Sequence, residues 1–126
     1  MEQGPKIDFA VVMTKRTKAM AIDVIKLVGE FPNKPEFWVI GKQLLKAGTS
    51  VAANYRATTR GRSDKEFLAK LTIVVEECDE VLFWLELLEE ASLIDADRLH
   101  DIKTEATELL KILPKSKRSL NERLNK

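Results

Sequence analysis

Between Phe67 and Leu88, apolar side chains recur at alternating steps of four and three residues, and this heptad pattern constrains the fold more than any other part of the chain. Its members are Phe67, Leu71, Val74, Cys78, Val81, Leu85 and Leu88. That spacing places them on one face of a helix, as in the seam between packed helices. Directly before the pattern, Ser63-Asp64-Lys65-Glu66 fits a capping box, in which the serine and glutamate side chains each satisfy a free backbone N–H. The sequence therefore predicts a helix over about residues 64–91.

Two helices are expected before it. The first spans about residues 8–29, because its apolar residues are spaced at threes and fours until shortly before Pro32. The second spans about residues 36–61, with a seam of Phe37, Ile40, Leu44, Ala47, Val51, Asn54 and Thr58. Its glycines, Gly41 and Gly48, each cost about 1 kcal/mol relative to alanine in a helix, so a break near Gly48 is one alternative. A continuous helix is the preferred interpretation, since small residues around Gly48 let a neighbouring helix come close.

A fourth helix is expected over about residues 96–113, capped by Asp95 and stopped by Pro114. The tail 114–126 is basic and weakly patterned, so it forms either a short extra helix or no fixed structure by itself. Short connections between long helices make neighbouring helices antiparallel. The predicted fold is all-α: one domain, residues 1–126, forming an antiparallel up-down-up-down four-helix bundle with a basic C-terminal tail.

Composition limits where such a chain works. With 126 residues, 44% of them hydrophobic, the chain can bury one core. The single cysteine excludes an intramolecular disulfide, and the N-terminus lacks a basic segment followed by an apolar run. Charges interrupt every apolar stretch before it reaches the roughly 20 residues that cross a bilayer. We therefore expect a cytoplasmic protein that does not enter a membrane.

Charge is segregated along the chain, although the formal net charge is only +1. Between Phe37 and Arg62 every charged residue is basic, and between Leu71 and Asp97 every charged residue is acidic. The simpler interpretation is a helical hairpin that pairs these charges, at about 0–1 kcal/mol for each exposed pair. In an up-down bundle, however, the start of the first helix, the turn after the second and the end of the fourth share one end, where basic residues accumulate. The nucleic-acid-binding candidates there are Arg56, Arg60, Arg62, Lys115, Lys117 and Arg118.

A second set of residues is suited to assembly. Its members are Trp38, Asn54, Tyr55, Glu77 and Trp84. Asn54 is expected on the apolar seam, where a buried amide specifies register or assembly. Tyr55 and Arg56 are expected just off the seam, and the simpler alternative to an assembly role is a packed tyrosine beside an Arg56–Glu77 ion pair between helices. The two tryptophans suit either a subunit interface or ordinary core packing.

Catalytic signals are weak. Cys78 occupies a core position of the heptad and is expected to fill space, not to act as a nucleophile. The chain has one histidine, His100, which is too few for the Glu-x-x-His pairs that hold two metals in bundle enzymes. No phosphate-binding loop is present, because Arg60-Gly61-Arg62-Ser63 lacks the required glycine and lysine spacing. The sequence predicts no enzyme, no cofactor and no metal site.

Several short motifs carry a family resemblance. They are Gly48-Thr49-Ser50-Val51, Ala53-Asn54-Tyr55-Arg56, Arg62-Ser63 and the run from Trp84 to Leu88. With them, about residues 7–110 resemble the four-helix-bundle family named after proteins encoded in intervening sequences of 23S ribosomal RNA genes. The resemblance implies a bundle protomer that assembles as a ring, often of five subunits. Some related bundle proteins bind nucleic acid beside a reverse transcriptase in diversity-generating retroelements. Ala57-Thr58-Thr59 departs from the family's acidic versions of this segment.

These observations lead to two hypotheses. The leading one is a non-enzymatic, homo-oligomeric helical scaffold whose basic end binds RNA or DNA through the phosphates, without strong sequence preference. The alternative is a protein-protein interaction or assembly module that does not bind nucleic acid. Such a module would hold an acidic protein partner on the same basic surface, or pair basic and acidic surfaces between subunits.

Overall fold

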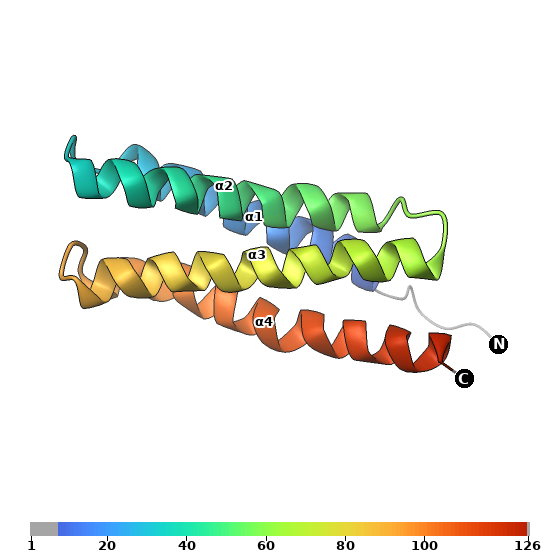
Figure 1. Ribbon diagram of the computed structural model, residues 1–126. Coiled ribbons are helices and arrows are strands. Elements are labelled where there is room, and N and C mark those ends of the chain that lie inside the picture. Colours follow the sequence, from blue (N-terminus) through green and yellow to red (C-terminus); the bar gives the residue numbers. More distant parts are fainter. Residues whose placement is uncertain (1–7, 126) are drawn as a thin grey trace.

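Four helices make up the computed structural model, which describes residues 8–125, with side chains except at 119–121 and 123. They are α1 (Phe9–Gly29), α2 (Pro35–Thr58), α3 (Asp64–Glu90) and α4 (Ala96–Leu124). Successive helices run in opposite directions and are joined by short turns (Figure 1). The expected all-α four-helix bundle is confirmed.

Local chemistry fixes the helix starts. The Asp8 carboxylate accepts the Ala10 N–H at 2.9 Å and caps α1. Pro35 begins α2, where a missing backbone N–H costs nothing. The Ser63 hydroxyl accepts the Glu66 N–H at 3.1 Å, so the predicted serine cap of α3 is confirmed.

The heptad of α3 forms the centre of the core. Leu71, Val74, Cys78, Val81, Leu85 and Leu88 are each at most 1% exposed. The Cys78 thiol donates a weak hydrogen bond to the Ala106 carbonyl of α4, with 3.6 Å between sulfur and oxygen. Burial, with smaller contributions from nearby carboxylates, raises the pKa of the Cys78 thiol to about 12. The predicted core position of Cys78 is confirmed, and the thiol stays protonated at neutral pH.

The seam of α2 differs from the prediction near its end. Tyr55 is only 1% exposed, whereas Asn54 is half-buried and donates to the Ser50 carbonyl and hydroxyl of its own helix at 3.0 and 2.8 Å. A step of four from Val51 to Tyr55, followed by a step of three to Thr58, follows the 3.6-residue period better than the predicted step to Asn54. The placement of Asn54 on the seam and Tyr55 off it was therefore wrong.

The second helix also ends earlier than predicted, at Thr58 in place of residue 61. The hydroxyls of Thr58 and Thr59 donate to the carbonyls of Tyr55 and Arg56 in the last turn. The Thr59 hydroxyl satisfies the Arg56 carbonyl, which a longer helix would have paired with the Arg60 N–H; that N–H donates to the Ala57 carbonyl instead. As a result, the two arginines that follow, Arg60 and Arg62, lie on the turn between α2 and α3.

The fourth helix is longer than predicted, because it continues through Pro114 to Leu124. A proline removes one helical hydrogen bond and usually ends or kinks a helix. Here tertiary packing outweighs that loss. Leu113 is fully buried just before the proline, and Lys117 and Leu124 continue the same stripe as half-buried residues. The part of the expected tail that is described, residues 114–125, thus belongs largely to α4, while residue 126 lies outside the described residues.

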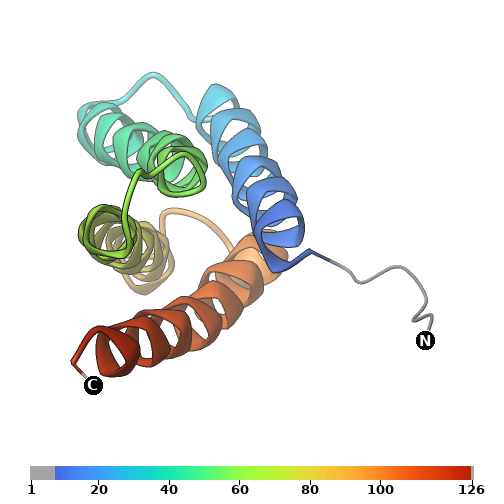
Figure 2. The same cartoon turned by 90° about the vertical axis from the view of Figure 1, so that its right-hand side faces the viewer.

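Contact between α1 and α4 is the weakest of the four neighbouring pairs. The two helices lie together near the α3–α4 turn and then diverge, so that the end of α4 lies far from the start of α1 (Figure 2). Charged side chains bridge them, for Arg16 donates two hydrogen bonds to Glu105, at 2.9 and 2.6 Å, and Arg98 pairs with Glu30. The gathering of basic residues at one end therefore depends on how α4 packs on α3.

Gly48 sets the close approach of α1 and α2. A Cβ atom added at Gly48 would lie 3.0 Å from two methyl carbons of Val24, which is fully buried. The helix runs without a break through this point, which confirms the preferred interpretation of the two glycines.

Replacing Gly48 with leucine should therefore destabilise the fold, by about 1–3 kcal/mol, because the larger side chain overpacks the contact with Val24. The matched control is Gly29→Leu, since nothing lies within 4 Å of a Cβ added there and its effect should stay below about 1 kcal/mol. Urea unfolding of both variants measures the difference. Equal stability of the two variants would contradict this account of Gly48.

Candidate nucleic-acid interface and assembly surfaces

The basic candidates come together at one end of the bundle. The turn between α2 and α3, which carries Arg60 and Arg62, lies at the same end as the last turns of α4 (Figure 1). Those turns of α4 carry Lys115, Lys117 and Arg118. Figure 2 looks onto this end, with the α2–α3 turn and the end of α4 both facing the viewer. Segments far apart in the sequence thus contribute cations to one surface, which we call the basic end.

Four cations of the described residues form ion pairs, and the nucleic-acid-binding candidates are not among them. Ion pairs join Arg16 to Glu105, Arg98 to Glu30, Lys103 to Glu89 and Lys111 to Glu108. Within the described part of the chain, none of the six nucleic-acid-binding candidates has such a partner. Five of the six are exposed, and Lys117 is half-buried. Their charges are therefore available to an external anion.

A shallow hollow of about 320 Å³ lies beside the turn, but it is not built to hold a single phosphate. Arg62 borders it together with the Asp64 carboxylate. Two of its hydroxyls are already used inside the protein, because Thr59 donates to Arg56 and Ser63 caps α3. The basic end therefore offers separate charges on a surface, not a phosphate pocket.

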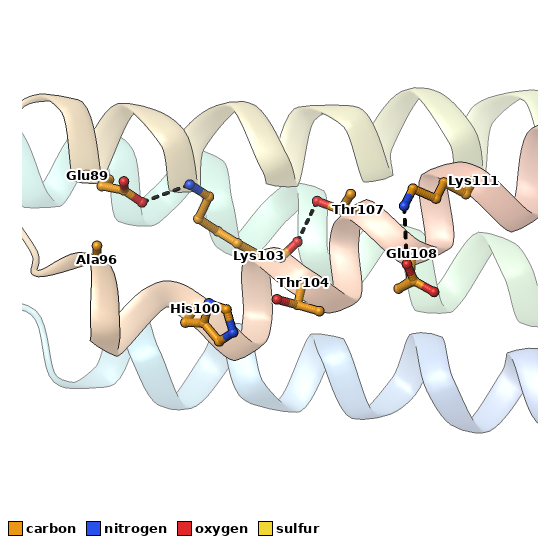
Figure 3. A pocket seen from close by; sticks show the side chains of 8 residues that line it. All are labelled: Glu89, Ala96, His100, Lys103, Thr104, Thr107, Glu108 and Lys111. Carbon is orange, nitrogen blue, oxygen red and sulfur yellow. Dashed lines mark hydrogen bonds and ion pairs between the residues drawn. The ribbon is translucent and has the colours of Figure 1, made fainter.

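A second hollow of about 400 Å³ lies along α4, beside α3 (Figure 3). Its lysines face carboxylates: Lys103 Nζ lies 2.8 Å from Glu89 Oε1, and Lys111 Nζ lies 3.5 Å from Glu108 Oε2. His100 also borders it and is exposed. Among residues 8–125, no group of three or more histidine, cysteine, aspartate or glutamate side chains is arranged to bind a metal ion.

The assembly candidates on α3 are only partly buried. Glu77 and Trp84 are half-buried, yet Glu77 Oε2 and Trp84 Nε1 are buried atoms without a hydrogen-bond partner in the described structure. Burial raises the pKa of Glu77, the neighbouring Glu80 raises it further, and Lys46 on α2 lowers it. The alternative of an Arg56–Glu77 ion pair between helices of one protomer was wrong, since Arg56 lies toward α1 and forms no ion pair with Glu77.

Tyr55 is a core residue of the protomer. Burial, and to a smaller extent the charge of Asp8, raises the pKa of the Tyr55 hydroxyl to about 12, so the ring stays neutral at physiological pH. With 1% of its surface exposed, it does not offer a contact to another molecule in this conformation.

Trp38 lies on the surface instead, 58% exposed, and its indole N–H donates to the Asn33 side chain at 2.7 Å. Ordinary core packing therefore does not explain this tryptophan. Other large apolar side chains that the sequence analysis did not select are exposed as well. They include Ile22 and Ile25 on α1, Val39 on α2, and Ile73 and Phe83 on α3. Their signal in the sequence was their position outside the apolar seams.

Comparison with known proteins identifies the family. Residues 10–115 match the family model described as 23S rRNA-intervening sequence protein. The chain belongs to this family. Among solved structures, the fold is similar to a crystal structure of a protein of unknown function from the S23 ribosomal protein family of Bacteroides thetaiotaomicron VPI-5482. The TM-score is 0.80 and the identity 29%, over 86% of this chain and 97% of that chain.

The match confirms the family expected from the sequence, and neither description names a catalytic activity. A search of curated proteins found no match. Within the described residues, no helix combines the length and the apolar character that crossing a membrane requires.

The raised pKa of Glu77 predicts that the stability of the fold depends on pH. Because its pKa is raised in the folded state, folding favours the protonated form. The contribution of protonated Glu77 to stability is complete below the pKa that a glutamate has in the unfolded chain, about 4.3. It is lost as the pH rises through the pKa of Glu77 in the folded state. Glu77→Gln, which stays neutral, should therefore raise the stability at pH 7 and have less effect near pH 4. Urea unfolding at both pH values measures this.

The exposed neighbour Glu76 provides the control, and Glu76→Gln should change stability by less than about 0.5 kcal/mol at either pH. A loss of stability in Glu77→Gln at pH 7 would show that the ionised carboxylate makes a favourable interaction instead.

Proposed function

We propose that this protein is a non-enzymatic, homo-oligomeric helical scaffold of the cytoplasm, whose basic end binds nucleic acid without strong sequence preference. The observation that carries the proposal is the basic end itself. Cations from the α2–α3 turn and from the last turns of α4 lie at one end of the bundle, without ion-pair partners in the described part of the chain.

Binding would proceed by neutralisation of phosphates. Each lysine or arginine that contacts a phosphate releases condensed counterions, and this release favours association on any sequence. The arginines add geometry, because a guanidinium group can donate two parallel hydrogen bonds to one phosphate. The hollow beside the α2–α3 turn is too shallow to enclose a base and read its edges, so RNA and DNA should both bind.

Assembly would strengthen such binding. A single basic end offers few phosphate contacts, whereas cyclic symmetry places every copy of it on one face of a ring. Several weak contacts on one polyanion then act together, since linked sites raise the effective concentration of each further contact. The exposed apolar residues of α1, α2 and α3 support self-association.

A specific observation also favours the alternative function, a protein-protein interaction or assembly module. The outward face of α3 carries exposed carboxylates, including Glu76, Asp79 and Glu86, beside the half-exposed Phe83. Such a surface would repel nucleic acid and attract a basic, partly apolar protein surface.

The test is fluorescence anisotropy of labelled RNA and duplex DNA across a salt series. Affinity should fall steeply with salt, and a triple variant with glutamine at Lys115, Lys117 and Arg118 should bind more weakly. The slope of log K against log salt should decrease in magnitude by about 0.7–0.9 for each phosphate that the variant no longer neutralises. The control triple, with glutamine at Lys26, Lys34 and Arg98 near the opposite end, should retain the wild-type slope.

Equal reductions of affinity in the two triple variants would place binding elsewhere on the surface. No binding by the wild-type protein at low salt would reject the nucleic-acid function and favour the interaction module.

A further inference from the structure

A groove between α1 and α2 exposes apolar side chains along much of its length. It contains two hollows, of about 480 and 410 Å³. Ile22 and Ile25, 44% and 49% exposed, border the first hollow, and Ala52 and Ala53 leave room in it. Trp38, which is 58% exposed, borders the second.

The charges of this groove have one sign. Lys18 and Arg56 border the first hollow and Lys42 borders the second. Neither hollow has an aspartate or glutamate among its described lining residues. None of the three cations forms an ion pair within residues 8–125. The groove is therefore suited to a helix that presents apolar and acidic side chains together.

The chain itself contains such a helix surface. The outward face of α3 carries Ile73 and Phe83, 38% and 50% exposed, among the exposed carboxylates of Glu76, Asp79 and Glu86. Helical spacing places these five residues on one side of α3, away from its buried seam. We call them the α3 ridge. From Leu71 to Asp97 the sequence contains no lysine or arginine, so the ridge is purely acidic in charge.

The ridge and the groove also match in height along the bundle. Lys46 lies 12 residues before the end of α2, and Glu77 lies 13 residues after the start of α3. Because the two helices are antiparallel and joined by a short turn, these two residues lie at similar levels. At 1.5 Å per residue, Phe83 lies about 9 Å from that level, toward the α3–α4 turn. Because α2 runs the opposite way, Lys42 and Trp38 lie about 6 and 12 Å from it in the same direction. Phe83 is thus level with the second hollow.

Ile73, at the other end of the ridge, is level with the first hollow. Ile73 lies about 6 Å from the level of Lys46 and Glu77, toward the basic end, at 1.5 Å per residue. Thr49 and Ala53, which line the first hollow, lie about 5 and 10 Å from it in that direction. Two exposed apolar residues of α3 are therefore spaced like the two hollows.

We propose that the α3 ridge of one copy docks into the α1–α2 groove of the next copy at equal height. This inference rests on the assembly part of the proposed function and assigns the two surfaces that meet. The contact is heterologous, since ridge and groove are different surfaces, and such contacts form either rings or open filaments. Docking at equal height involves no shift along the bundle axis, which is a condition for a closed ring, and it places all basic ends on one side.

The experiment measures the mass of the full chain by sedimentation equilibrium. One variant reverses the groove charges, Lys42→Glu with Arg56→Glu, and a second reverses the ridge charges, Asp79→Lys with Glu86→Lys. All four residues are exposed, so circular dichroism should show that both variants remain folded. Each variant should dissociate at a protein concentration at least tenfold above that of the wild type. A chain that carries all four reversals should recover assembly, because the complementary charges are restored with opposite signs.

The control reverses Lys26 and Asp101, which border a different hollow between α1 and α4, and should keep the wild-type mass. Wild-type assembly in both reversed variants would overturn the docking of ridge on groove while leaving the proposed scaffold intact. Failure of the fourfold variant to recover, or equal dissociation of the control, would also overturn it. A wild-type protein that is monomeric at all concentrations would reject the assembly part of the proposed function, and this inference with it.

Discussion

Burial of α3 between α2 and α4 is the constraint on which the rest of the bundle depends. Six of its side chains are at most 1% exposed, so the helix cannot rotate or slide without opening the core. Its two neighbours must then lie antiparallel to it, because the turns that join them are short (Figure 1). Because Gly48 of α2 has no side chain, Val24 of α1 packs directly against it and brings α1 close to α2. The fourth helix depends on α3 more than on α1, from which it diverges (Figure 2).

The same packing explains which parts of the fold could be predicted from the sequence. The seam of α3 and the cap at Ser63 are encoded locally, in spacing and in one side chain, so both were predicted. The end of α4 could not be predicted from local rules, because Pro114 is a strong local stop signal and the contacts that outweigh it come from other helices. The prediction exchanged the positions of Asn54 and Tyr55 because it assumed a step of three residues after Val51, whereas the buried face of the helix takes a step of four. Such an error is small in sequence but moves a side chain from the surface to the core.

The candidate site was predictable only in part, for a related reason. Charge segregation in the sequence indicated a basic end, since the topology alone determines which helix ends lie together. Individual partners required the structure. The sequence suggested Glu77 as the partner of Arg56, but helical rotation turns Arg56 toward α1 and leaves Lys46 as the cation that acts on Glu77. The apolar residues outside the seams, such as Ile22 and Phe83, became informative only when their exposure was known.

The distribution of charge follows from the need to keep two kinds of surface separate. An acidic ridge beside the basic end would compete with phosphates for the same arginines, because opposite charges a few ångströms apart attract even in water. Apart from Asp64 and Glu66 in its first turn, the exposed carboxylates of α3 begin at Glu76. Glu76 lies about 18 Å along the helix from the start of α3. Screening weakens interactions between exposed charges beyond about 8 Å at physiological salt, so the ridge leaves Arg60 and Arg62 free. A single helical hairpin can therefore carry an acidic surface for one contact and a basic turn for another.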